Sequence, residues 1–233
     1  MIRAQRIFSI PAIMQMRFLS PQAAAVSWWL SGGISAGNCY AAYAAKGAAS
    51  LAASYSNLNN PGTNDAGVGV APTWGAATGW VFNGSTQYLT TAFLPEADQS
   101  QTVILRFSNL TSSGALTGTR GFGSGDIFAV RGSQGSNAVR YRHGAAAVDS
   151  SPQHTVGTLC IAGNQGYRDG SADGAALAGW GGAAGAYPMY IGGYNNGTGM
   201  SLPDSVYIQA IAIYDTTLTA PQVLAVSNAM AAL

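Results

Sequence analysis

The side chains that could bind a small molecule are few, and they lie in predicted loops. Trp180 stands in the run GWGG, and Tyr194, Asn195 and Asn196 stand in the run GGYNNG. An aromatic ring can stack on the face of a sugar, and amides on nearby loops can hold its hydroxyl groups. These four residues are the predicted ligand-binding site. In the alternative interpretation, Trp180 covers an open end of the fold and the asparagines only shape a turn.

Carboxylates arranged for catalysis are not visible. Retaining glycoside cleavage needs an acid and a nucleophile about 5 to 5.5 Å apart. Glu96 is the single glutamate, and it lies with Asp98 in the loop LPEADQ. The other aspartates stand singly beside Gly, Ser, Pro or Thr, as in turns: Asp65, Asp126, Asp149, Asp169, Asp173, Asp204 and Asp215. We therefore expect no enzymatic activity.

Nucleophilic and metal chemistry find no motif either. His143 and His154 lie at strand ends without a nucleophile motif beside them, so we interpret both as structural. The sequence has no Cys-x-x-Cys run and no histidine pair at ligand spacing, so no cofactor is expected. Asp126 and Asp204 are conceivable members of a calcium site, which stays an open alternative.

The composition favours a large β protein with a neutral polar surface. Among 233 residues there are 31 glycines, only 8% are charged, and the net charge is +1. A single glutamate and a single lysine, Lys46, argue against long exposed helices. The basic residues before Asp65 are too few to indicate a nucleic-acid site. Cys39 and Cys160 are interpreted as two buried thiols rather than a disulfide.

The strand pattern is strongest near the C-terminus. Residues 206–214, VYIQAIAIY, are apolar on both parities except at Gln209, which predicts a mid-sheet strand covered on both faces. Similar patterns predict strands at 39–43, 102–107, 127–131, 139–143, 154–162 and 187–191. Residues 79–91 predict a hairpin around Asn83-Gly84-Ser85, and Asp169-Gly170 predicts another tight turn.

Two helical segments are expected. The Ala-rich run 46–55 predicts a short helical turn. Thr219 and Gln222 form a capping box, and Pro221 suits a first turn. Apolar residues then recur at helical spacing, so the sequence predicts one amphipathic helix at 219–232.

The order of several motifs resembles the concanavalin A-like lectin/glucanase superfamily in its laminin G-like form. These motifs are WVFNGSTQYL at 80–89, TVILRF at 102–107, YRDG at 167–170 and IQAIAIYDTTLT at 208–219. The resemblance implies an all-β jelly-roll sandwich of two antiparallel sheets at 38–233, preceded by an N-terminal arm at 1–37 and closed by the short C-terminal helix. Members of this superfamily are either enzymes acting on polysaccharides or non-catalytic binding and adhesion domains.

The interpretation of the N-terminal segment determines which function hypothesis is favoured. It begins like a signal peptide, but Arg17 interrupts the apolar run, and residues 7–19 are too short to span a bilayer, which needs about 20 apolar residues. We interpret it as an assembly arm whose large apolar side chains must be covered by a partner. These side chains are Ile7, Phe8, Ile10, Ile13, Met14, Met16, Phe18 and Leu19.

The Ala-, Gly- and Asn-rich style of the chain, with WWL ahead of the domain, resembles virion proteins of tailed bacteriophages. The first function hypothesis is therefore a non-catalytic structural or adhesion protein of a virus particle, bound to its own copies or to a coat protein. The alternatives are a secreted carbohydrate-binding module that recognises a surface glycan, and a polysaccharide hydrolase. None of the three involves nucleic acid or a membrane span.

Overall fold

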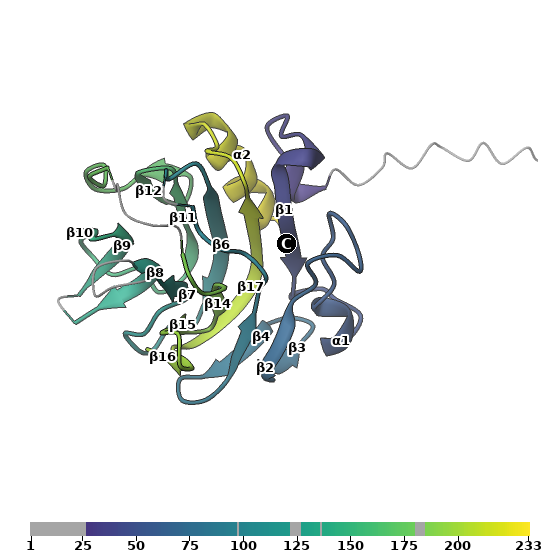
Figure 1. The fold of residues 1–233 in the computed structure, drawn as a ribbon. Helices are drawn as coiled ribbons and strands as arrows, with labels where there is room; N and C mark the ends of the chain where they lie inside the picture. Colours follow the sequence, from purple (N-terminus) through teal and green to yellow (C-terminus); the bar gives the residue numbers. More distant parts are fainter. Residues whose placement is uncertain (1–26, 97, 122–126, 136, 180–184) are drawn as a thin grey trace, which may run out of the picture.

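The computed structural model describes residues 27–96, 98–121, 127–135, 137–179 and 185–233. Within these residues the chain folds as two stacked β-sheets with one longer helix packed on the outside (Figure 1). The prediction of an all-β sandwich with a C-terminal helix is therefore confirmed. The strand pairs are antiparallel apart from one parallel bridge between Asn195 and Thr119.

Sheet A has eight strands in the order β13-β12-β11-β6-β17-β4-β3, with β1 also paired to β17. Its strands are β1 (Cys39–Ala44), β3 (Thr73–Gly75), β4 (Gly79–Asn83), β6 (Thr102–Ser108), β11 (Gly157–Ala162), β12 (Gln165–Arg168), β13 (Ser171–Ala172) and β17 (Ser205–Tyr214).

Sheet B has nine strands, seven of them in the order β10-β9-β8-β7-β14-β5-β2, with β15 beside β7 and β16 beside β15. Its strands are β2 (Gly67–Val70), β5 (Tyr88–Thr90), β7 (Thr117–Arg120), β8 (Ile127–Gln134), β9 (Ala138–Gly144), β10 (Ala146–Ser150), β14 (Tyr190–Ile191), β15 (Tyr194–Asn195) and β16 (Met200–Ser201). The helical elements of the described chain are η1 (Trp28–Leu30), η2 (Ala36–Asn38), α1 (Leu51–Ser54) and α2 (Ala220–Ala231).

Strand β17 is the centre of sheet A. Strand β6 pairs along one edge, while β4 pairs with residues 205–208 of the other edge and β1 with its last residues. The register shifts by one residue at Gln209, where the chain bulges. Because of this bulge, Ile208 and Ile211 both face the interior between the sheets, while Ala210 faces outward. The predicted mid-sheet strand with two covered faces is confirmed.

Helix α2 covers the outward face of β17. Its Val223, Val226 and Met230 pack in one buried cluster with Ala212 and Tyr214 of the strand. The capping box forms as predicted, since the Thr219 N–H donates to Gln222 Oε1 at 3.0 Å. Trp28 of η1 joins the same cluster, and the Tyr214 hydroxyl donates to the Trp29 carbonyl at 2.7 Å.

The interior between the sheets is aromatic and aliphatic. Fully buried Trp80 on β4 donates its indole N–H to Ser54 Oγ of α1 at 2.7 Å, so the short helix is tied to the core. From sheet B, Leu89, Phe128 and Tyr141 fill the same interior. Cys39 and Cys160 are buried free thiols, as expected, and burial raises the pKa of Cys39 to about 12.

The hairpin predicted within residues 79–91 is wrong. Strands β4 and β5 lie in different sheets, because β4 pairs with β17 and β5 pairs with β14. The Asn83 side chain accepts hydrogen bonds from the backbone N–H groups of Ser85 and Thr86, and this turn carries the chain from one layer to the other. The tight turn at Asp169-Gly170 is confirmed, since both residues have positive φ, 49° and 82°.

The described part of the predicted arm, residues 27–37, packs on the sandwich through Trp28 and Ile34. The eight apolar residues predicted to drive assembly, from Ile7 to Leu19, lie outside the described residues. The division into an arm and a sandwich therefore stays a prediction.

Helix α2 should contribute strongly to stability through its buried face. Met230→Ala removes a fully buried side chain, and we expect it to lower the free energy of unfolding by roughly 2 to 5 kcal/mol. Leu224→Ala on the same helix is the matched control. That side chain is 43% exposed, so its loss should cost less than about 1 kcal/mol. Equal costs in chemical denaturation would contradict the docked helix.

Candidate functional site

An open groove lies on the outer face of sheet B, where β5, β14 and β15 meet. It encloses about 570 Å³ and is lined mainly by aromatic, hydroxyl and amide side chains. We call it the tyrosine groove, and its lining includes Tyr88, Thr90, Tyr187, Tyr190, Asn195 and Thr198.

Two tyrosines form the floor of this groove. The rings of Tyr88 and Tyr190 stack with centroids 4.6 Å apart and an interplanar angle of 27°. They come together because Tyr190 pairs with Thr90, which places β14 beside β5 with both rings on the outward parity. Burial, and then the neighbouring Tyr88, raise the pKa of Tyr190.

Two glycines allow aromatic rings of the groove to pack closely against the backbone. A Cβ on Gly69 of β2 would lie 2.2 Å from the Tyr88 ring, so the ring rests directly on the strand backbone. A Cβ on Gly197 would lie 2.4 Å from the Tyr187 ring. Gly197 also has φ +88°, a conformation that glycine adopts without strain. These close approaches fix the positions of the Tyr88 and Tyr187 rings.

The predicted site residues Asn195 and Asn196 lie at this groove and hold its loop. Asn195 is 4% exposed, and its Nδ2 donates to the Pro188 carbonyl at 2.8 Å while its Oδ1 accepts from the Gly197 N–H at 3.0 Å. Asn196 Oδ1 accepts from both the backbone N–H and the hydroxyl of Thr198 at 2.9 Å. The amide of Asn195 is thus fully engaged in shaping the loop, and its predicted ligand contact stays a prediction.

Another predicted residue, Tyr194, is separate from this groove. Tyr194 is 7% exposed and lines a smaller pocket beside Arg142. Trp180 lies outside the described residues. The sequence analysis missed Tyr88, Tyr187 and Tyr190, because only the pairing of β5 with β14 brings residues a hundred positions apart together. In the sequence, these three tyrosines are recognisable only as aromatic residues within two predicted strands.

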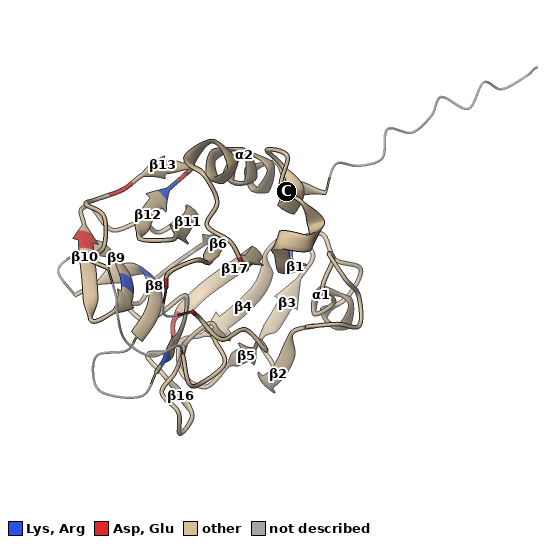
Figure 2. Ribbon diagram, turned by 45° about the horizontal axis from the view of Figure 1, so that its top comes forward, with Lys and Arg blue, Asp and Glu red and all other residues tan. Residues whose placement is uncertain are grey.

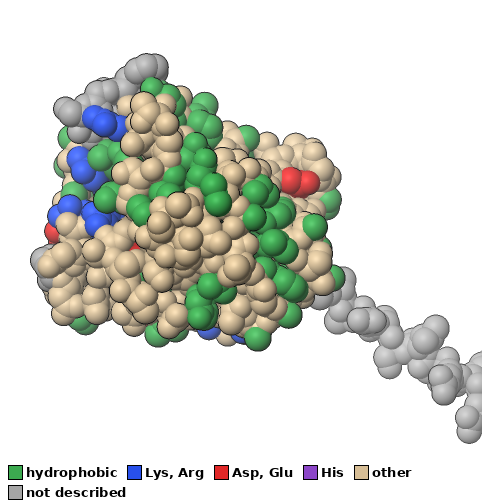
Figure 3. Space-filling view, turned by 90° about the horizontal axis from the view of Figure 1, so that it is seen from below, with side chains coloured by type: hydrophobic (Ala, Val, Ile, Leu, Met, Phe, Trp, Pro, Cys, Tyr) green, Lys and Arg blue, Asp and Glu red, His purple; other side chains and the backbone are tan. Residues whose placement is uncertain are grey.

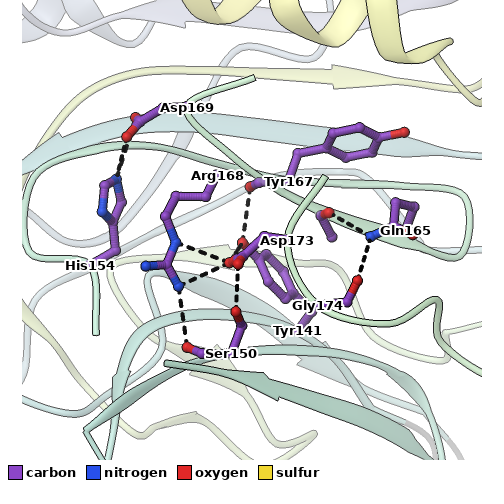
Figure 4. A network of polar contacts seen from close by, with 10 residues as sticks. Tyr141, Ser150, His154, Gln165, Tyr167, Arg168, Asp169, Asp173 and Gly174 are labelled. Carbon is purple, nitrogen blue, oxygen red and sulfur yellow. Dashed lines mark hydrogen bonds and ion pairs between the residues drawn. The ribbon is translucent and has the colours of Figure 1, made fainter. Parts of the chain in front are cut away.

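Several charged residues of the described chain lie around β8, β9, β10 and β12 (Figure 2). Asp173, which follows β13, accepts hydrogen bonds from the Tyr141 hydroxyl at 2.9 Å, from Arg168 Nε at 3.0 Å and from the Ser150 hydroxyl (Figure 4). Beside it, His154 contacts Asp169. This network joins the edge of sheet A to the edge of sheet B, so we interpret its carboxylates as structural.

Two aspartates differ from the turn residues expected. Asp149 stands within strand β10 and forms a bidentate ion pair with Arg140, with both N–O distances 2.6 Å. Asp204 is fully buried, accepts from Ser112 and from the Gly114 N–H, and has a raised pKa because of burial. No cluster of three metal-ligating side chains exists among the described residues, and Asp126, the other calcium candidate, lies outside them.

Comparisons with known proteins bear on the fold alone. No family model and no curated protein matches this sequence. Solved structures do match. Trypanosoma rangeli sialidase in complex with 2,3-difluorosialic acid is 18% identical with a TM-score of 0.56, and the match covers 85% of this chain and 33% of that one. This chain thus spans about a third of the sialidase.

Two further solved structures match more than four fifths of this chain. Domain 4 of AbnA, a GH43 extracellular arabinanase from Geobacillus stearothermophilus, in complex with arabinotriose, is 14% identical with a TM-score of 0.50. The match covers 82% of this chain and 98% of that one. The binding domain of Paraclostridial mosquitocidal protein 1 is 10% identical with a TM-score of 0.56, covering 83% of this chain and 52% of that one. At these identities the sandwich fold is shared, and the concanavalin A-like assignment stays a prediction.

No helix in the described part of the chain is long and apolar enough to cross a membrane.

The buried histidine should make stability depend on pH. Burial lowers the pKa of His143, opposed by its contact with the Glu96 carbonyl, so the unfolded chain binds this proton more readily. The free energy of unfolding should therefore fall as the pH drops through about 6.5 towards the lowered folded-state pKa. Denaturant titrations of His143→Gln should show a shallower fall. Parallel curves for the variant and the wild type would refute this role.

Proposed function

We propose that this chain is a non-catalytic carbohydrate-binding domain that holds its ligand in the tyrosine groove. The observation that carries the proposal is the stacked pair of Tyr88 and Tyr190 on an open, outward-facing floor. The groove admits an extended ligand from the side, as a polysaccharide chain requires.

The chemistry of the groove suits a neutral sugar. The tyrosine side chains offer apolar surface, and their hydroxyls offer polar atoms beside it. The Thr90 side chain lines the same groove, so its hydroxyl is a second polar group for a sugar hydroxyl. The ordered loop at Asn195 and Asn196 closes one side.

The fold likeness supports the same class of function. The arabinanase domain that this chain matches over nearly its whole length is in complex with arabinotriose, an oligosaccharide. With the motif order noted in the sequence, we place this chain among the concanavalin A-like sandwiches that bind rather than cleave. None of the three solved structures named above is a virion protein, so the particle hypothesis gains no support from them.

We propose that the domain is not a hydrolase because of where its carboxylates lie and what they contact. Asp149 and Asp173 are committed to arginines, and buried Asp204 is held by Ser112 and Gly114. Glu96 and Asp98 lie in one exposed loop, where Asp98 accepts from the Ser100 N–H at 2.9 Å. None of these carboxylates lines the tyrosine groove.

Removing either floor tyrosine should weaken glycan binding. We expect Tyr88→Ala and Tyr190→Ala each to raise the Kd for the tightest-binding neutral oligosaccharide at least about tenfold, which is about 1.4 kcal/mol. The probes are arabinotriose, galactotriose and cellotriose, measured by isothermal titration calorimetry.

Tyr207→Ala is the matched control, because Tyr207 is a half-buried tyrosine on β17 of the opposite sheet. It should leave the Kd unchanged. Thermal melting checks that all variants fold. The proposal fails if the wild type binds none of the three sugars, or if the groove variants bind as tightly as the control.

A further inference from the structure

Three arginines lie next to one another on the outer face of sheet B, away from the tyrosine groove. Arg131 on β8 stands directly opposite Arg140 on β9, and Arg142 follows two residues later with the same outward parity. Figure 3 shows Lys and Arg side chains gathered on one side of the molecule with apolar side chains beside them. Like charges directly opposite each other destabilise a strand pair, so this arrangement needs a compensating partner.

The described residues supply only part of that compensation. Asp149 pairs with Arg140, and backbone carbonyls of Gly114 and Ser113 accept from Arg131. Burial and then the charge of Arg140 lower the pKa of Arg131, a sign that the two cations repel each other. Arg142 has a buried Nε without a hydrogen-bond partner in the described part of the chain. A buried donor of this kind indicates a missing acceptor.

A small pocket opens among these three side chains. Ala129 forms part of its floor, Tyr194 and Leu202 form a wall, and the space encloses about 80 Å³. That is roughly the volume of three water molecules. The pocket therefore suits one planar or tetrahedral anionic group and is too small for a ligand of drug size, which needs about 300 Å³ or more.

The pocket and the tyrosine groove lie on the same face of sheet B, and a line of cross-strand partners connects them. Arg142 stands opposite Ala129, which stands opposite Gly118. Gly118 stands opposite Tyr190 in the groove. Three strand steps separate Arg142 from Tyr190, or ~14 Å at the usual strand spacing. The consecutive residues Tyr194 and Asn195 divide the two hollows, one lining each. A single oligosaccharide of a few units can reach both.

We propose that Arg131, Arg140 and Arg142 form a subsite for an anionic substituent, a carboxylate or a sulfate ester, on the glycan whose neutral part lies in the tyrosine groove. This inference rests on the proposed function. Arginine suits the role because its planar donors match both oxyanions in bidentate geometry. Arg142, whose Nε has no partner among the described residues, makes the main contact, and Arg140 remains held in place by Asp149.

An acidic glycan fits these observations better than a nucleic acid. The three arginines carry a single paired acid, and the whole chain has a net charge of only +1. Non-specific nucleic-acid binding rests on a larger set of phosphate contacts. The pocket also has room for only one anionic group.

The test compares matched probes by calorimetry at low and high salt: galactotriose, trigalacturonic acid, a sulfated galactotriose and a short oligothymidine. We expect the wild type to bind at least one acidic trisaccharide about tenfold more tightly than galactotriose. Arg142→Met, which keeps most of the side-chain volume, should remove this preference and leave the affinity for galactotriose unchanged. The carboxylate and sulfate probes show which oxyanion the subsite takes.

Arg106→Met is the matched control. Arg106 lies on the outer face of sheet A, also has a buried Nε without a partner among the described residues, and its replacement changes the net charge by the same amount. It should retain the full preference for acidic probes. Galactotriose binding without any acidic preference would overturn the subsite and leave the proposed function intact.

Three further outcomes would each contradict the proposed subsite. Loss of the preference in Arg106→Met as well as in Arg142→Met would show a general charge effect and overturn the subsite. Oligothymidine binding tighter than every trisaccharide would replace the glycan with nucleic acid. Failure of all four probes to bind would overturn the proposed function together with the subsite.

Discussion

The structure depends on the burial of β17 on both of its faces. One face needs the interior that sheet B supplies, and the other needs α2 and η1, so both layers and the outer helix follow from one apolar strand. The bulge at Gln209 allows the strand to serve both clusters along its whole length. As a consequence, the helical layer occupies the outer face of sheet A around β17, and the outer face of sheet B is left open for a ligand.

The polar network around Asp173 holds the edges of the two sheets together. Sheet B can present arginines and tyrosines at fixed positions only if its edge strands are held against sheet A. The Tyr141 hydroxyl reaches the Tyr167 carbonyl at 3.0 Å as well as Asp173, so β9 is tied to β12. Arg168 extends the tie to the Ser150 carbonyl at the end of β10. The ion pair between Arg168 and Asp173 thus lies where the two layers meet.

The sequence predicts those parts of the fold that local patterns determine. The two-sided strand, the capped helix and the Asp169-Gly170 turn each follow from a few neighbouring residues. The hairpin at 79–91 fails because Asn83-Gly84 suits a sharp turn whether the strands pair or separate, and long-range pairing with β17 decides. Most residues of the candidate site could not be predicted for the same reason. Tyr88 and Tyr190, or Arg131 and Arg142, become neighbours only through sheet order, while Asn195 was visible because its loop is local.

The central claim is that the outer face of sheet B is the ligand-binding face. The most direct measurement is an amide NMR titration of the isotope-labelled protein with arabinotriose and with trigalacturonic acid. The account predicts that shifts with the neutral sugar centre on β5, β14 and residues 187–199, and that the acidic sugar adds shifts on β8 and β9. Shifts confined to the outer face of sheet A would contradict it.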